Sequence, residues 1–183
     1  MGDTAQDRYV AHQARKAAVL EQVAADTIAD IMENRHSIRR YTREPISDTH
    51  LKRLLDAAKT APSSCDRQAI TVTPITARDD LALLGGLLVG GVGWVHRAPL
   101  LLLLTADPTA YKAPGEIDRL GMPQLDAAHV SQSILLTAVS LNLGACFVNP
   151  NIRERDVPHF HAVFGPGLLC GAVAVGHPVE WSV

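Results

Sequence analysis

The chain has 183 residues, of which 47% are hydrophobic and 20% are charged, and its formal net charge is -2. These values are typical of one globular domain, and they do not favour nucleic acid or an anionic membrane surface as the main partner. The segment from Met1 to Gln13 is polar and has no apolar leader, so we expect a cytoplasmic protein.

The N-terminal part predicts helices on either side of a basic run. Residues 4–33 contain neither glycine nor proline, and a loose apolar stripe predicts a helical extension over residues 1–30, followed by a single domain over 31–183. After the basic run, Ser47 is a good N-cap for the next helix, which Pro62 stops.

The rest of the chain alternates between predicted strands and helices. The predicted strands cover 69–76, 100–105, 145–148 and 168–175, and Pro74 suggests an edge or an end of the first. Helices are predicted over 79–88, from Pro123 to a C-cap at Gly144, and weakly over 153–164, where Pro158 interrupts. Residues 107–122 are predicted to form a loop. In the long helix, the residues that recur at helical spacing are Leu125, Ala128, Gln132, Leu135, Leu136, Val139 and Leu143. This order predicts central apolar strands covered by helices.

The basic run is the first candidate for ligand binding. Arg35, Ser37 and Arg39 alternate, so in an extended chain they share one face. Two guanidinium groups and a hydroxyl suit a phosphate dianion, because the arginine fork matches phosphate oxygens. Taken alone, the run is better explained as a solvated basic loop.

Two later loops are further candidates. The loop from Ala61 to Gln68 is dense in hydrogen-bonding side chains and could present them to a polar heterocycle, although simple turn chemistry explains it too. The segment from Gly144 to Asn151 begins with small residues, which let the backbone approach a ligand closely. The alternative there is an ordinary exit from a helix into a strand.

Together, these motifs resemble the nitroreductase superfamily of FMN enzymes. The motifs that carry the resemblance are the RxSxR run, the Leu-rich helix ending in Ala-Pro-Ser-Ser, a Gln before a strand, the helix that starts near Asp126 and ends in Leu-Gly, and a final strand ending in Gly-x-Pro. The resemblance covers Ile31 to Pro178. Within the family, the Pro-Ser-Ser-Cys loop and the Phe-Val-Asn-Pro-Asn segment look closest to short members linked to biosynthetic clusters.

The resemblance implies an α+β fold, a three-layer sandwich with a mostly antiparallel central sheet flanked by helices. It also implies a homodimer with FMN at the subunit interface. By position, Arg35, Ser37 and Arg39 would hold the phosphate and ribityl chain, with His36 contributing. The residues implied along the ribityl chain and the isoalloxazine edge are Pro62, Ser63, Ser64, Asp66 and Gln68. The residues implied on the other side of the ring are Cys146, Phe147, Val148 and Asn149.

Two departures from the family pattern bear on this assignment. The family usually has Asn where this chain has Asp66, and a carboxylate accepts hydrogen bonds but cannot donate them. Its negative charge should also lower the flavin reduction potential. Many members carry a basic C-terminal segment that clamps the phosphate, but nothing basic follows His177 here. Two expectations stay open: Arg35 and Arg39 hold the phosphate with little help, or Arg40, Arg43 or a partner chain compensates.

The function implied is FMN-dependent transfer of hydride or electrons between a reductant such as NAD(P)H and a small organic substrate, either a nitro or quinone compound or a biosynthetic intermediate. Tyr111 and Lys112, in the predicted loop, are candidate substrate contacts. No catalytic side chain is assigned, and no metal site is expected, since the three cysteines have no metal-like spacing. Two alternatives stay open: a non-catalytic flavin-binding or interaction protein with this fold, and an unrelated α/β domain whose RxSxR run binds another phosphate.

Overall fold

A computed structural model describes residues 11, 25–111 and 121–179 of the chain. The chain divides into two compact units, Met1–Arg35 and His36–Val183. In the first unit, helix α2 covers Ala25–Glu33. The rest of the helical extension predicted for residues 1–30 lies outside the described residues, apart from residue 11. Within the described ranges, no helix is long and apolar enough to cross a membrane.

The second unit is built on one antiparallel sheet of four strands in the order β1-β2-β4-β3. The strands are β1 (Ile70–Ile75), β2 (Leu100–Ala106), β3 (Gly144–Val148) and β4 (Leu168–Gly176). All four were predicted to within two residues at either end. Pro74 lies in β1, an edge strand, which confirms the edge position predicted for it, because proline has no N–H for a second neighbour.

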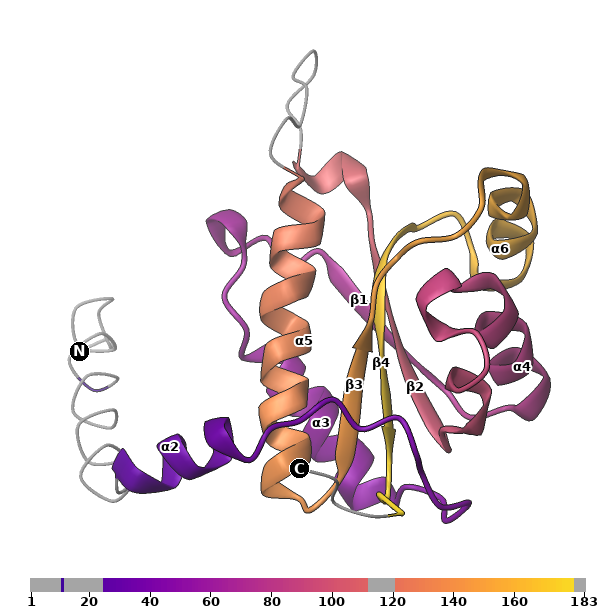
Figure 1. The fold of residues 1–183 in the computed structure, drawn as a ribbon. Coiled ribbons are helices and arrows are strands. Elements are labelled where there is room, and N and C mark those ends of the chain that lie inside the picture. The colour runs from indigo at the N-terminus through magenta and orange to yellow at the C-terminus, as the bar shows by residue number, and fades with distance from the viewer. Residues whose placement is uncertain (1–10, 12–24, 112–120, 180–183) are drawn as a thin grey trace. The chain divides into compact units, whose positions relative to one another are not determined.

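The sheet forms the middle of three layers, as Figure 1 shows, and this confirms the predicted fold class. The helices of the outer layers are α3 (Asp48–Lys59) and α5 (Met122–Ser140) on one face, and α4 (Arg78–Leu87) and α6 (Val157–Phe164) on the other. Strand β2 explains the layering. Leu100, Leu102 and Leu104 pack in the core with α3 and α5, whereas Leu101 and Leu103 pack in the core with α4 and α6. A strand covered on both faces is apolar at every position.

Local signals determine most of the helix ends. The Ser47 hydroxyl oxygen accepts a hydrogen bond from the backbone N–H of His50 at 3.2 Å, which confirms the predicted N-cap of α3. The segment predicted as one weak helix over 153–164 is divided just before Pro158, into a 3-10 turn over Glu154–Asp156 and helix α6. Pro158 lies in the first turn of α6, where its missing N–H has no helical acceptor to lose.

The C-terminal end of α5 also differs from the prediction. The helix ends at Ser140, and Asn142 takes the left-handed conformation, with φ 56°. Gly144, predicted as the helix cap, instead opens β3. Asparagine tolerates the left-handed region better than most residues, so it can end a helix in place of glycine.

Helix α5 buries a face that matches the predicted stripe only in part, with Leu135 buried in both. Leu125 is 49% exposed, although it was assigned to the apolar stripe. The buried residues of the helix are Pro123, Asp126, Ala127, Val130, Ser131, Ile134, Leu135 and Ala138. Two polar residues, Asp126 and Ser131, lie on this face and weaken the hydrophobic pattern that would have revealed it.

Candidate functional site

The segment around Ser37 lies along the outer edge of β3. Ser37 forms a parallel bridge with Ala145, and the backbone N–H of Ile38 donates to the Ala145 carbonyl at 3.1 Å. The Ile38 side chain is only 5% exposed, whereas Ser37 and Arg39 are exposed. The alternation predicted for this run is therefore observed between residues 37 and 39. It leaves a hydroxyl and a guanidinium group open to solvent on one side.

Tyr41, which is buried, holds the backbone of the same segment in place. It is 8% exposed, and its hydroxyl donates to the Ile38 carbonyl. Tyr41 also forms an antiparallel bridge with Pro178, just beyond β4. Burial raises the pKa of the Tyr41 phenol, so it remains a protonated donor at neutral pH. This contact fixes the backbone that carries Ser37 and Arg39.

Arg39 lies over the ring of Trp94, with its guanidinium carbon 5.7 Å from the ring centre. The Trp94 indole N–H donates to the Gly90 carbonyl at 3.0 Å, which holds the ring in place. In the part of the chain that the structure describes, no carboxylate pairs with Arg39, and its Nη1 makes only a long contact of 3.4 Å to the Ser37 carbonyl. The positive charge is therefore available to an anion. The sequence prediction did not join Trp94 to the basic run.

Only some of the site residues predicted on and after strand β3 are exposed to solvent. Cys146 and Val148 are each 2% exposed, so any contact they make to a ligand would use their backbone. Phe147 is 37% exposed, and Asn149 is exposed at the end of the strand. The Phe147 ring lies over Gly171, where a β-carbon would be 2.6 Å from the ring. Gly171 has φ 140°, which a residue with a side chain rarely adopts.

The loop after α3 has an unusual backbone. Three residues with side chains have positive φ: Cys65 at 52°, Asp66 at 54° and Gln68 at 49°. The loop is held internally by the Ser63 hydroxyl oxygen, which accepts from the Gln68 N–H at 2.9 Å, and by the Gln68 side-chain amide, which donates to Asp66 at 3.1 Å. Such strained positions cluster at functional sites. The side chains of Asp66 and Gln68 are exposed, and so are Pro62 and Cys65.

One buried carboxylate joins this loop to α5. Asp126 is 2% exposed and accepts hydrogen bonds from the Ser64 backbone N–H at 3.0 Å and from the Ser64 hydroxyl at 2.9 Å. Beside the loop, a cavity of about 250 Å³ opens between α3, β1 and α5. Its lining residues are Leu55, Ala58, Lys59, Ala61, Ser63, Gln68, Ile70, Val72 and Val130.

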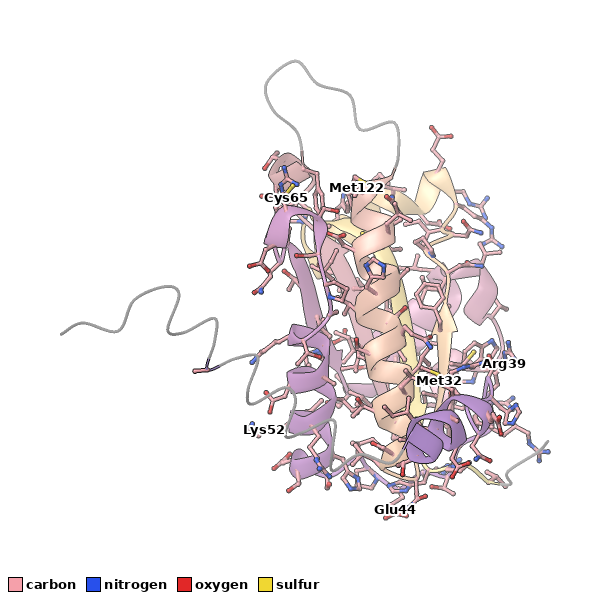
Figure 2. All side chains as sticks on the ribbon, turned by 90° about the vertical axis from the view of Figure 1, so that its left-hand side faces the viewer. Met32, Arg39, Glu44, Lys52, Cys65 and Met122 are labelled. Atoms are coloured by element: carbon pink, nitrogen blue, oxygen red, sulfur yellow. The ribbon has the colours of Figure 1, made fainter. Side chains whose placement is uncertain are left out.

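The two predicted halves of the site lie at opposite ends of α5. The loop is bound to Asp126 in the second turn of the helix, whereas Ser37 bridges Ala145, just beyond the other end. The helix between Asp126 and Ser140 spans about 20 Å. In Figure 2, Cys65 lies beside the Met122 end of α5, far from Arg39. A single chain therefore does not bring these two groups of residues together.

The remaining predicted site residues differ in their exposure and location. His36 is exposed in the second unit, next to Ser37, whereas Arg35 is the last residue of the first unit. Tyr111 is 8% exposed and packs in the core with α3 and α5, so it does not have the exposure that the predicted substrate contact requires. Lys112 lies outside the described residues. Among the described residues, no group of three His, Cys, Asp or Glu residues could hold a metal ion.

Comparison with known proteins gives one family match. The family model of the nitroreductase family matches residues 32–89 and 86–177. A curated Bacillus subtilis protein named FMN reductase (NAD(P)H) is 29% identical over 176 residues, which cover 86% of this chain and 68% of that protein. A Staphylococcus saprophyticus protein named NADPH-dependent oxidoreductase is 33% identical over 79% of this chain. The chain spans 64% of that relative's length.

Solved structures are similar over most of the chain. A Desulfovibrio desulfuricans protein, solved in complex with FMN, has a TM-score of 0.70 and 26% identity over 85% of this chain and 88% of its own. The NfrA2 structure from B. megaterium has a TM-score of 0.75 over 85% of this chain and 68% of its own. Its identity is 24%, so this second likeness concerns the fold alone.

Proposed function

The chain belongs to the nitroreductase family, and from this premise we propose that it is an FMN-dependent oxidoreductase that transfers hydride or electrons between NAD(P)H and a small organic substrate. The names of the Bacillus and Staphylococcus relatives and the FMN complex of the Desulfovibrio protein support this proposal. The substrate class that we propose is a nitro or quinone compound or a biosynthetic intermediate. We further propose a domain over residues 31–183, an N-terminal extension over 1–30, and a cytoplasmic location.

The observation that carries the proposal is the exposed pair on the edge of β3. Ser37 and Arg39 point away from the buried Ile38, and Arg39 has no carboxylate partner among the described residues. A guanidinium group and a hydroxyl on a backbone fixed by β3 and Tyr41 fit a phosphate group. These residues would hold the FMN phosphate, with Arg35 and His36 as the adjoining candidates.

The loop after α3 fits the other end of the cofactor. Asp66 and Gln68 are exposed, and their side chains are hydrogen-bonded to each other. The carboxylate and the amide could therefore form hydrogen bonds with the polar edge of a heterocycle. Pro62, Ser63 and Ser64 would line the chain that leads to it, and Phe147 and Asn149 would lie on the opposite side. When bound, FMN would supply the redox chemistry, and these residues would supply binding and orientation.

We propose a homodimer in which each cofactor lies between two copies. The Arg39 end and the Asp66 end of one chain are separated by most of the length of α5, about 20 Å along its axis. Two copies related by a two-fold axis could bring the Arg39 end of one against the Asp66 loop of the other, twice over. This arrangement would bring the Ser37–Arg39 segment of one copy next to Asp66 and Gln68 of the other.

Anaerobic reduction of the FMN-loaded protein tests the proposed function. We expect the protein to bind added FMN, and NADH or NADPH to bleach the bound flavin. A nitro or quinone acceptor should then restore the absorbance. If FMN binds but NADH, NADPH and dithionite all leave it oxidised, the chain is a non-catalytic flavin-binding protein instead. If FMN does not bind, both readings fail.

A further inference from the structure

Asp126 is the one buried acidic residue in the part of the chain that the structure describes. The proposed function gives it no role, because its carboxylate is enclosed between α5 and the loop after α3. A carboxylate is costly to bury unless hydrogen-bond donors compensate for the lost water. Here the donors are the backbone N–H of Ser64, which is 3.0 Å from Oδ1 and 3.1 Å from Oδ2, and the Ser64 hydroxyl, which is 2.9 Å from Oδ1.

These hydrogen bonds tie the loop to the body of the fold. The other bonds at Asp66 and Gln68 run to residues of the loop itself, such as Ser63. They can maintain the shape of the loop but not its position. The contacts of Ser64 with Asp126 reach across to a helix 62 residues further along the chain. Residues with a strained backbone persist only where the surrounding structure holds them in place. For this loop, the hydrogen bonds to Asp126 provide that constraint.

A third polar group, the hydroxyl of Tyr111, lies next to the carboxylate of Asp126. The hydroxyl of Tyr111 is buried, and within the described residues it has no hydrogen bond that meets ordinary geometry. Burial, together with the neighbouring charge of Asp126, raises the pKa of this phenol, so the proton stays on Tyr111.

We propose that Asp126 is a positioning residue that holds the loop after α3, through Ser64, where Asp66 and Gln68 can meet the flavin. This proposal rests on the proposed function, because it takes the loop to be part of the flavin site. Asp126 itself would not touch the cofactor. Its contribution would be to keep a strained, exposed loop in one conformation before the ligand arrives.

Three variants test this role. Asp126→Asn keeps the size of the side chain, but it removes the negative charge and replaces one of the two oxygens that face the Ser64 N–H with an N–H₂ group that cannot accept a hydrogen bond. Ser64→Ala removes the hydroxyl and leaves the backbone bond. Ser131→Ala is the matched control, since Ser131 is also buried on α5 but donates to Ala128 of its own helix at 2.9 Å.

Amide hydrogen exchange on the flavin-free protein is the first measurement. We expect exchange over residues 63–68 to become about tenfold faster in Asp126→Asn and about threefold faster in Ser64→Ala, since a charged acceptor or a hydroxyl donor has been lost. Exchange in β2 and β4 should stay unchanged, and so should the loop of Ser131→Ala. Unchanged loop exchange in both Asp126→Asn and Ser64→Ala would overturn the proposal. If Asp126→Asn does not fold, Ser64→Ala decides alone.

FMN affinity is the second measurement. The dissociation constant should rise about tenfold in Asp126→Asn and less in Ser64→Ala, with no change in Ser131→Ala. Faster exchange with unchanged affinity would overturn the link to the flavin. If the unsubstituted protein binds no FMN, the proposed function fails, and the exchange measurement still decides whether Asp126 holds the loop.

Discussion

A β-carbon placed on Gly144 would lie 2.7 Å from Cγ2 of Ile38 and 2.9 Å from its Cβ. Real carbon atoms do not approach this closely, so the segment that carries Ser37 and Arg39 can lie against β3 only because residue 144 is a glycine. The contact is backbone against a buried, branched side chain, which has little room to move. Gly144 therefore sets the distance between β3 and the proposed phosphate site.

Gly144→Ala should push Ile38 away from β3 and loosen the segment. We expect a loss of about 1–3 kcal/mol in the free energy of unfolding, as for other overpacked sites, together with weaker FMN binding. Urea unfolding and FMN titration measure the two effects. Gly86→Ala is the control, because a β-carbon there meets no atom within 4 Å and Gly86 lies inside helix α4. That substitution should be neutral or stabilising, and an equal loss in both variants would contradict the role of Gly144.

Replacing Trp94 should weaken binding of the phosphate group specifically. The ring under Arg39 contributes about 0.5–1 kcal/mol if it behaves as an ordinary exposed cation–π contact. Trp94→Leu should therefore raise the FMN dissociation constant about two- to fivefold, and Trp94→Phe, which keeps an aromatic ring, should lose less. Riboflavin, which has no phosphate, is the control ligand. Equal losses for FMN and riboflavin would mean that Trp94 supports the fold and does not orient Arg39.

Mixing two defective chains tests whether the flavin site is shared between copies. Arg39→Ala removes one proposed half of the site, and Gln68→Ala removes the other. If the halves come from different copies, a mixed dimer contains one site with both substitutions and one site with neither. We expect mixing, after unfolding and refolding together, to restore FMN binding to a fraction of the sites. Mixtures that bind no more FMN than the separate variants would contradict the shared site.

The cysteines should differ sharply in reactivity. Cys65 is exposed in the loop, whereas Cys146 and Cys170 are buried. Burial raises the pKa of Cys170 to about 11, so at pH 8 only about one molecule in a thousand carries its thiolate. A chromogenic thiol reagent should therefore modify one cysteine in the folded protein, and Cys65→Ser should abolish this fast reaction. Saturating FMN should slow it. Modification at the same rate with and without FMN would argue against a flavin beside this loop.

Most helices and strands could be predicted from the sequence because their signals are local, whereas the antiparallel sheet was implied only by the family resemblance. The unbroken leucines of β2, the proline of β1 and the Ser47 cap each depend on neighbours in the chain or on simple burial. The face of α5 could not be predicted, because Asp126 is buried there to hold a loop and not to fill a core. An acidic residue beside apolar positions at helical spacing is the signal that could have pointed to it.

The site was predicted only in part, for a related reason. The alternation of Ser37 and Arg39 follows from extended backbone, and the structure bears it out. Distances between segments depend on tertiary structure, so the sequence did not reveal that the Arg39 end and the Asp66 loop lie at opposite ends of α5. It also did not reveal that Tyr111 is buried, since a tyrosine next to a predicted loop has no periodic pattern to indicate its environment.

The binding of FMN and riboflavin to the unsubstituted protein and to Arg39→Ala tests the central claim most directly. We predict that the unsubstituted protein binds FMN at least tenfold more tightly than riboflavin. Arg39→Ala should lose about 1.5–3 kcal/mol of FMN binding, as expected for a charge-assisted contact, and should bind riboflavin unchanged. A protein that binds neither flavin, or that binds both equally and is indifferent to Arg39, would contradict an FMN site built on the Ser37–Arg39 segment.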